Sequence, residues 1–133
     1  MRIVLDANVL ASGVFWAGYP FRVLELWAHE RIRVLVSKAI LQEYAGLLRE
    51  LGRKEDKERL ADLWVSFVFH HAVLIDVRSR VDVCRDPDDN KYLECALDGG
   101  ASFVVSGDGD LLSLGSFRGI PIVKPRRFAE SVG

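Results

Sequence analysis

The sequence is poor in cysteine, with only Cys84 and Cys95 among 133 residues. These two thiols lack the spacing of a metal site and do not define a disulfide framework, so a reducing cytoplasm is the predicted location. The chain also lacks an excess of charge of either sign, because its formal net charge is only −1. Contact with nucleic acid would therefore depend on local patches rather than on the charge of the whole protein.

Long hydrophobic runs are also absent. No apolar stretch approaches the length of a membrane-spanning helix, and the N-terminus reaches Asp6 too soon for a signal-peptide core. We therefore expect no membrane association and no leader. Half of the residues are apolar and the charges are well mixed, which predicts a single globular domain over residues 1–133 with a real core.

Short apolar runs rich in β-branched residues alternate with helical patterns. Runs of this kind indicate strands buried on both faces, and they lie at Ile3–Leu5, Val34–Val36, Val73–Ile75, Phe103–Val105 and Ile120–Val123. The patterns between them predict helices at Phe21–Glu30, from a Ser37 cap to Leu51, at Arg59–Phe69, and at Asp89–Asp98 before a Gly-Gly stop. This alternation predicts an α/β fold, a three-layer α/β/α sandwich with a mainly parallel sheet.

Acidic residues follow the predicted strands or begin the predicted helices. Asp6 ends the first strand, Asp108 follows the fourth, Glu43 lies early in the second helix, and Asp86, Asp88 and Asp89 precede another helix. Ligands of open parallel sheets bind outside the carboxyl ends of the strands. We therefore expect these acids to converge on one edge of the sheet.

Each acid also has a structural explanation. Asp86-Pro87 is a good helix start, Gly107–Asp110 could form only a turn, and Asp6 could cap a neighbouring element. Glu43 could be solvated like Glu50, which shares its flank of the helix. Together, however, such clusters repel one another unless positive charge lies among them. Oxygen-only ligands favour Mg²⁺ or Mn²⁺, and such ions commonly serve phosphodiester hydrolysis.

Four motifs in order resemble those of the PIN domain family: Leu5-Asp6-Ala7-Asn8, Ser37 to Glu43-Tyr44, Arg85-Asp86-Pro87-Asp88-Asp89-Asn90-Lys91, and Val105-Ser106-Gly107-Asp108-Gly109-Asp110-Leu111. The resemblance covers essentially the whole chain and includes the closing segment 122–128. It is similar in particular to the PIN-type (VapC-like) toxins of prokaryotic toxin–antitoxin systems.

The resemblance implies an α/β/α fold and a Mg²⁺- or Mn²⁺-dependent ribonuclease. By position, the acidic quartet that binds metal and catalyses hydrolysis would be Asp6, Glu43, Asp89 and Asp108. Asp86 and Asp110 would be outer members of the metal site, and Asn8 and Ser106 would hold the carboxylates by hydrogen bonds. A toxin of this type also implies an RNA substrate, an antitoxin protein as partner and a homodimer.

Three alternatives remain open. A haloacid-dehalogenase-like phosphatase also places an Asp after its first strand, but it needs a second acid where this chain has Asn8. A response-regulator receiver expects an acidic pair there and a phosphorylatable Asp after the third strand. A PIN-like module could bind a partner without cutting RNA.

Candidate contacts to RNA and between subunits are scattered along the chain. A solvated surface explains most of the basic residues considered: Arg53, Lys54, Lys57, Arg85, Lys91, Arg126 and Arg127. Trp16 and Tyr19, expected in a loop after the first strand, could stack on a base or pack in a core or interface. Spare apolar residues at Phe15-Trp16 and Trp64–Phe69 are candidates for a dimer surface.

Overall fold

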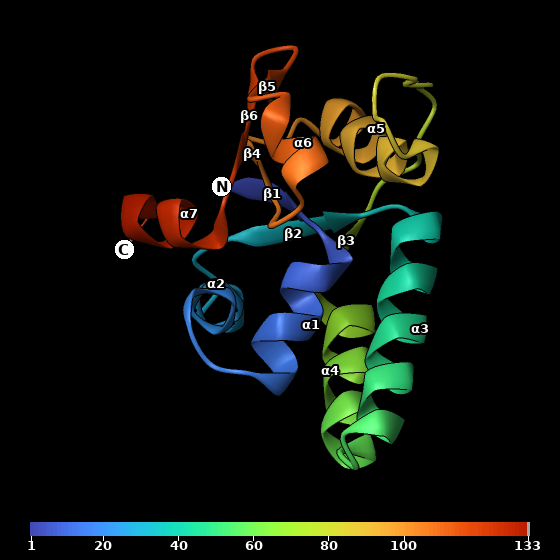
Figure 1. Cartoon of the computed structure of the whole chain (residues 1–133), viewed down its shortest axis with the longest axis vertical. Helices are drawn as coiled ribbons and strands as arrows, with labels where there is room; N and C mark the ends of the chain where they lie inside the picture. Colours follow the sequence, from blue (N-terminus) through green and yellow to red (C-terminus); the bar gives the residue numbers. More distant parts are fainter. Residues whose placement is uncertain (133) are drawn as a thin grey trace.

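A six-stranded sheet forms the centre of the computed structural model, which describes residues 1–132 (Figure 1). Its strands are β1 (Arg2–Leu5), β2 (Arg33–Val36), β3 (Val73–Leu74), β4 (Phe103–Val105), β5 (Ser116–Phe117) and β6 (Ile120–Val123). They lie in the order β3-β2-β1-β4-β6-β5, and every pair is parallel except β5 with β6.

The predicted strands are confirmed, and most of their apolar residues are buried because helices cover both faces of the sheet. Leu74 of the edge strand β3 is an exception and is exposed. Ile3, Val4 and Leu5 of β1 have no exposed surface, which explains the uninterrupted apolar run. The third strand is shorter than predicted. Ile75 lies just beyond β3, although its N–H still donates to the carbonyl of Val36 at 2.7 Å.

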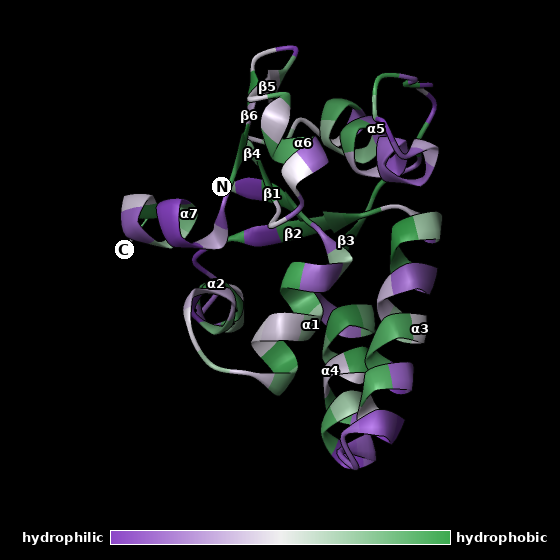
Figure 2. Ribbon diagram, viewed as in Figure 1, coloured by the Kyte–Doolittle hydropathy of each residue, from purple (hydrophilic) through white to green (hydrophobic). Residues whose placement is uncertain are grey.

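Helices form the two outer layers, which confirms the predicted sandwich (Figures 1 and 2). One side of the sheet carries α1 (Ala7–Phe15), α2 (Tyr19–Ala28), α3 (Lys38–Lys54) and α4 (Glu58–His71), while α5 (Asn90–Gly99) and α6 (Gly109–Ser113) lie on the other. The last helix, α7 (Pro125–Val132), packs against α2. The hydrophobic sides of α3 and α4 face each other and the core (Figure 2).

One sequence prediction is wrong at the start of the chain. The segment after the first strand is not a loop but α1, and Tyr19 begins α2, which runs two residues ahead of the predicted helix at both ends. Asp6 caps α1 by accepting the N–H of Asn8 at 3.0 Å. Phe15 is buried in the core, so it is not available for a dimer surface, whereas Trp16 ends α1 with half of its surface exposed.

Two further helix starts follow the predicted capping chemistry. The Ser37 hydroxyl accepts the N–H of Ile40 at 3.2 Å, and Asp86-Pro87 opens a short 3₁₀ helix, η1 (Pro87–Asp89), ahead of α5. The predicted helix from Asp89 therefore begins one residue later as an α-helix. The sequence interpretation missed α6, β5 and α7 because each is short.

Two further expectations concern the extent of the domain and its association with a membrane. Gly133, the final residue of the predicted domain, lies outside the described residues. Within residues 1–132, no helix is both long and apolar enough to cross a membrane.

Candidate active site

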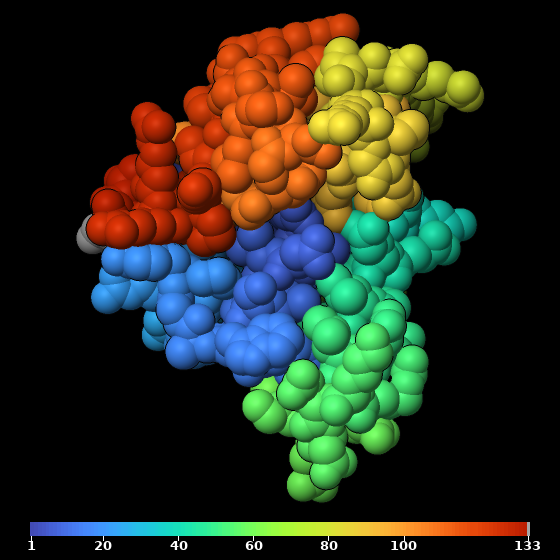
Figure 3. Space-filling view, viewed as in Figure 1, coloured from blue at the N-terminus to red at the C-terminus, as the bar shows by residue number. Residues whose placement is uncertain are grey.

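A pocket of about 500 Å³ opens at the carboxyl ends of β1 and β4. Its lining brings together segments that are far apart in the sequence, namely Asp6, Asn8, Val9, Ser12, Pro20, Asp86, Asp89, Gly107, Asp108 and Pro125. Figure 3 shows this meeting from outside: the blue N-terminal residues lie at the centre of the visible face, bordered by the yellow α5 region and the orange α6 region. The expected convergence of acids on one sheet edge is present.

Asp6 is the buried member of the pocket. Its Oδ2 accepts a hydrogen bond from the Ser106 hydroxyl at 2.7 Å, and its Oδ1 accepts the N–H of Asn8 at 3.0 Å. Burial raises the pKa of the Asp6 carboxyl above its usual range, the two hydrogen bonds lower it, and the charges of Glu43 and Asp108 raise it further. A charged Asp6 is therefore costly in this place unless positive charge approaches it.

Ser106 joins two of the acidic segments. Its side chain is fully buried, and while it donates to Asp6 it accepts the N–H of Asp108 at 3.0 Å. Asp108 in turn caps α6 by accepting the N–H of Asp110 at 3.4 Å. The hydroxyl predicted to hold the carboxylates thus fixes the start of the Asp108 loop against β1.

Asp89 and Asp108 both line the pocket, and each carboxyl lies within the electrostatic influence of the other. Burial is the largest cause that raises the pKa of Asp89, followed by the neighbouring carboxyl of Asp108 and then by the charges of Asp86 and Asp6; together they raise it to about 7. Near neutral pH this carboxyl is therefore poised between its neutral and charged forms. The repulsion expected from the sequence is present in the pocket.

Asp86 and Asp110 lie at the outer rim. Asp86 lines the pocket and accepts the N–H of Asp88 at 3.0 Å, in its role as cap of η1. Asp110 does not line the pocket; its carboxylate lies 3.9 Å from the guanidinium of Arg85, and both groups are largely exposed. An exposed pair at this distance contributes little to stability.

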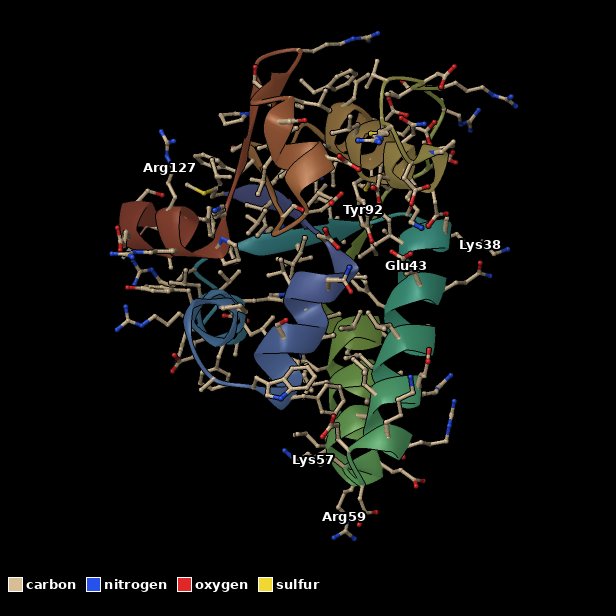
Figure 4. The ribbon with its side chains drawn as sticks, viewed as in Figure 1. Lys38, Glu43, Lys57, Arg59, Tyr92 and Arg127 are labelled. Atoms are coloured by element: carbon tan, nitrogen blue, oxygen red, sulfur yellow. The ribbon has the colours of Figure 1, made fainter. Side chains whose placement is uncertain are left out.

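Glu43 reaches the site from α3 and is held by two consecutive residues of α5. Lys91 donates to its Oε2 at 2.8 Å, and the hydroxyl of Tyr92 donates to its Oε1. Figure 4 shows Glu43 and Tyr92 pointing toward one another across the gap between α3 and α5. The Tyr92 oxygen also accepts the N–H of Ala7 at 3.2 Å, so Glu43 is tied to the start of α1 beside Asp6.

Lys91 supplies positive charge that the sequence interpretation did not place here. Its ammonium contacts both Glu43 and Asp88 at 2.8 Å, with only 15% of the side chain exposed. Burial alone would lower the pKa of Lys91, but hydrogen bonds to Asp88 and Glu43 raise it overall. Lys91 thus provides counter-charge for Glu43 and Asp88, whereas no cation among residues 1–132 forms an ion pair with Asp6, Asp89 or Asp108.

The donor set has the chemistry of a magnesium or manganese site, but it is not closed around one point. All of the acidic ligands offer oxygen, as those ions prefer, and the repulsion at Asp89 favours a cation among them. Yet among residues 1–132 no three Asp, Glu, His or Cys side chains are arranged so that they could hold an ion. The pocket therefore suits a divalent ion in charge and ligand type, although its side chains do not form a ready-made set of ligands among the described residues.

The predicted site residues differ in how close they lie to the pocket. Asp6, Asp86, Asp89, Asp108 and Asn8 share the pocket, Ser106 lies directly behind it, Glu43 is beside it and Asp110 is at its edge. Asn8 contributes its backbone N–H to Asp6. The sequence interpretation missed Tyr92, whose only signal was its position directly after the acidic helix start.

Comparison with known proteins shows the family of the chain and agrees with its fold. The family model described as PIN domain matches residues 2–110. The uncharacterized protein MJ1680 of Methanocaldococcus jannaschii is 31% identical over 121 residues, an alignment that covers 86% of this chain and 75% of that protein. A chain in the crystal structure of VapBC2 from Rickettsia felis, bound to a DNA fragment from its promoter, has the same fold with a TM-score of 0.62 at 14% identity, over 93% of this chain and 98% of that one.

The family match spans the three acidic motifs that line the pocket, from the end of β1 to the Asp108 loop. The family match is compatible with a catalytic member of the family and with a member that only binds a partner. It gives no support to the phosphatase and receiver alternatives. This chain belongs to the PIN domain family.

Proposed function

We propose that the protein is a metal-dependent endoribonuclease that hydrolyses phosphodiester bonds of single-stranded RNA. The observation that carries this proposal is the gathering of four aspartates in one pocket, where burial and the neighbouring carboxylates raise the pKa of Asp89 to about 7. Neighbouring carboxylates repel one another, which destabilises the folded protein. A cation bound among them would relieve that repulsion. PIN nucleases generally use divalent metal, which fits an oxygen-only ligand set.

In this proposal Asp6, Asp89 and Asp108 hold Mg²⁺ or Mn²⁺, and Asp86 and Asp110 assist from the rim. The bound ion supplies the polarisation of the phosphate and a water that loses its proton near neutral pH. Glu43, fixed by Lys91 and Tyr92, orients that water or contributes to the metal site. Ser106 keeps Asp6 and the Asp108 loop in register.

A cleavage assay tests the proposal. Defined single-stranded RNAs are incubated with the protein in Mg²⁺ or Mn²⁺, and we expect cleavage that EDTA abolishes. Asp6→Asn, Asp89→Asn and Asp108→Asn should each abolish it while the protein remains folded by circular dichroism. Activity that survives in EDTA, or in all three variants, would show that the carboxylates do not serve this chemistry.

Two glutamates on α3 provide a matched control. Glu43 is 30% exposed and contacts Lys91 and Tyr92 of another helix. Glu50, one heptad later, is 53% exposed and pairs with Lys54 of its own helix at 3.1 Å. Glu43→Gln should lower the cleavage rate severely and Glu50→Gln should not. Equal loss in the two variants would contradict the role of Glu43.

The cellular role that we propose is that of a toxin with an antitoxin protein as its partner, in the cytoplasm. The fold shared with VapBC2 supports this role. We also propose that residues 1–133 act as one domain and form a homodimer, using apolar residues of α4 such as Phe69, which is 57% exposed. Sedimentation at tens of micromolar, a range in which weak dimers are populated, should show the dimer.

The second candidate is a PIN module that binds a partner without cutting RNA. It is favoured by the absence of a ready-made metal arrangement within residues 1–132. The same assay separates the two functions: a module of this kind would bind its partner and leave RNA intact at every metal concentration.

A further inference from the structure

Two arginine side chains lie over one tyrosine ring at the rim of the pocket. The guanidinium carbon of Arg22 lies 5.5 Å from the centroid of the Tyr19 ring, and that of Arg126 lies 5.6 Å from it. Tyr19 and Arg22 belong to the first turn of α2 and Arg126 to α7, so the ring joins two helices. Attraction between a guanidinium and an aromatic ring favours this arrangement. We call these three residues the arginine–tyrosine shelf.

The shelf is continuous with the carboxylate pocket. Pro20, the residue after Tyr19, and Pro125, the residue before Arg126, both line that pocket. Pro20 is the second residue of α2 and Pro125 is the first residue of α7, so the wall and the shelf are built from the same two helix starts. The shelf therefore borders the pocket on the side of α2 and α7, within reach of a strand whose scissile phosphate lay among the aspartates.

A polyanion that binds at this pocket needs positive charge close by, because the carboxylates repel it. Two basic residues near the acidic segments already contact acids: Lys91 pairs with Glu43 and Asp88, and Arg85 lies near Asp110. Arg22 forms no ion pair in the part of the chain that the structure describes.

The second arginine of the shelf has one acidic neighbour. Arg126 pairs with Glu130 at 2.9 Å through its Nε, and both side chains are largely exposed. A guanidinium has five N–H donors, so Arg126 keeps donors for a phosphate.

We propose that Arg22 and Arg126 bind backbone phosphates of the RNA strand beside the bond that is cut. A guanidinium can donate two parallel hydrogen bonds to a phosphate, which gives direction as well as charge. Tyr19 acts as a positioning residue that holds the two arginines, rather than as a platform for a base. The proposal rests on the proposed function and names the part of the site that orients its substrate.

Binding measured without cleavage tests the shelf. A fluorescent single-stranded oligoribonucleotide is titrated with the wild-type protein in EDTA at several salt concentrations. Each phosphate contact to a single strand contributes about 0.7 to the slope of log K against log salt, so Arg22→Gln/Arg126→Gln should lower the slope by about 1.4 and the affinity at least about tenfold. In the cleavage assay the same pair should raise KM and leave kcat nearly unchanged.

A distant basic pair provides the control. Lys57 and Arg59 lie at the far end of the α3–α4 pair, away from Arg127 and the rest of α7 (Figure 4), and Lys57→Gln/Arg59→Gln removes the same charge. It should keep the wild-type affinity and slope. Tyr19→Phe should keep both as well, and Tyr19→Ala should lower the affinity because the arginines lose their common support.

Three outcomes would overturn the shelf: wild-type binding by the Arg22/Arg126 variant, equal loss in the control pair, or no binding of RNA by the wild-type protein at low salt. None of these depends on cleavage. A protein that binds through the shelf but never cuts would contradict the proposed function alone, and one that cuts without help from Arg22 and Arg126 would contradict the shelf alone.

Discussion

The hydroxyl of Tyr92 donates to the carboxylate of Glu43, and the same oxygen accepts the N–H of Ala7 at 3.2 Å. Tyr92→Phe removes both bonds, so we expect kcat to fall with little change in KM, because Glu43 loses its support. The free energy of unfolding should fall by about 1–3 kcal/mol, since the buried N–H of Ala7 loses its acceptor. Steady-state kinetics and urea unfolding measure the two effects.

Tyr44→Phe is the matched control for this prediction. The Tyr44 hydroxyl donates to the carbonyl of Leu5 and makes no hydrogen bond to a carboxylate among the described residues, so its loss should lower stability without the same loss of kcat. If both variants lost kcat in proportion to stability, the role of Tyr92 would be purely structural.

Two substitutions at Asp6 distinguish the role of its charge from its role as the cap of α1. Millimolar Mg²⁺ or Mn²⁺ should raise the melting temperature of the wild type, because an ion that binds only the folded state stabilises it, by about 2.7 kcal/mol at a hundred times its Kd. Asp6→Asn keeps the cap of α1 and should be at least as stable as wild type without metal, yet gain little from it. Asp6→Ala loses the cap and should be about 1 kcal/mol less stable than Asp6→Asn. Differential scanning calorimetry with and without metal would show a different order if Asp6 only caps the helix.

The raised pKa of Asp89 predicts how stability depends on pH. Since its pKa is about 7 in the folded protein and near 3.8 in the unfolded chain, the folded state binds more protons between those values. Stability from this group is therefore greatest below about pH 4 and declines as pH rises toward 7. In metal-free buffer, Asp89→Asn should show a smaller decline over that range than wild type in melts at stepped pH. An identical decline in both proteins would assign the effect to other groups.

Two helical glycines should respond in opposite directions to alanine. A Cβ at Gly13 would lie 2.6 Å from Cδ1 of Leu24 and 2.8 Å from the carbonyl oxygen of Pro20, whereas a Cβ at Gly46 would meet nothing within 4 Å. Gly13→Ala should cost about 1–3 kcal/mol because α2 must shift. Gly46→Ala should stabilise by about 0.5–1 kcal/mol through helix propensity. Denaturant unfolding of the two variants measures both effects. If Gly13→Ala were as stable as Gly46→Ala, the contact between α1 and α2 would be looser than the structure indicates.

The sheet could be predicted from sequence because its central strands are buried on both faces, and such burial leaves an uninterrupted β-branched run such as Ile3–Leu5. The helix α1 could not, since its apolar residues are so numerous that they show no amphipathic period, and Gly13 further weakens the signal. Its start was readable only as the ability of Asp6 to cap a neighbouring element, which the structure bears out.

The candidate site was predictable to the level of which acids meet, because parallel topology places strand ends at one edge. Partners were not predictable. Periodicity places Glu43 and Glu50 on one flank of α3, and only the packing of α5 against α3 brings Lys91 and Tyr92 to the first of them. The arginine–tyrosine shelf could not be predicted for the same reason. Arg22 and Arg126 are far apart in the sequence, and only the packing of α7 near Tyr19 brings both guanidinium groups over its ring.

Asp6 both opens α1 and forms part of the pocket floor, and this double role has an evolutionary consequence. Asparagine and serine rank with aspartate as helix caps, so a lineage released from selection for chemistry can replace this residue without losing the fold. Purifying selection on folding alone would accept three residue types here, while selection on hydrolysis would accept one. In any descendant of this domain, the residue after the first strand is therefore a marker of whether the chemistry is still under selection.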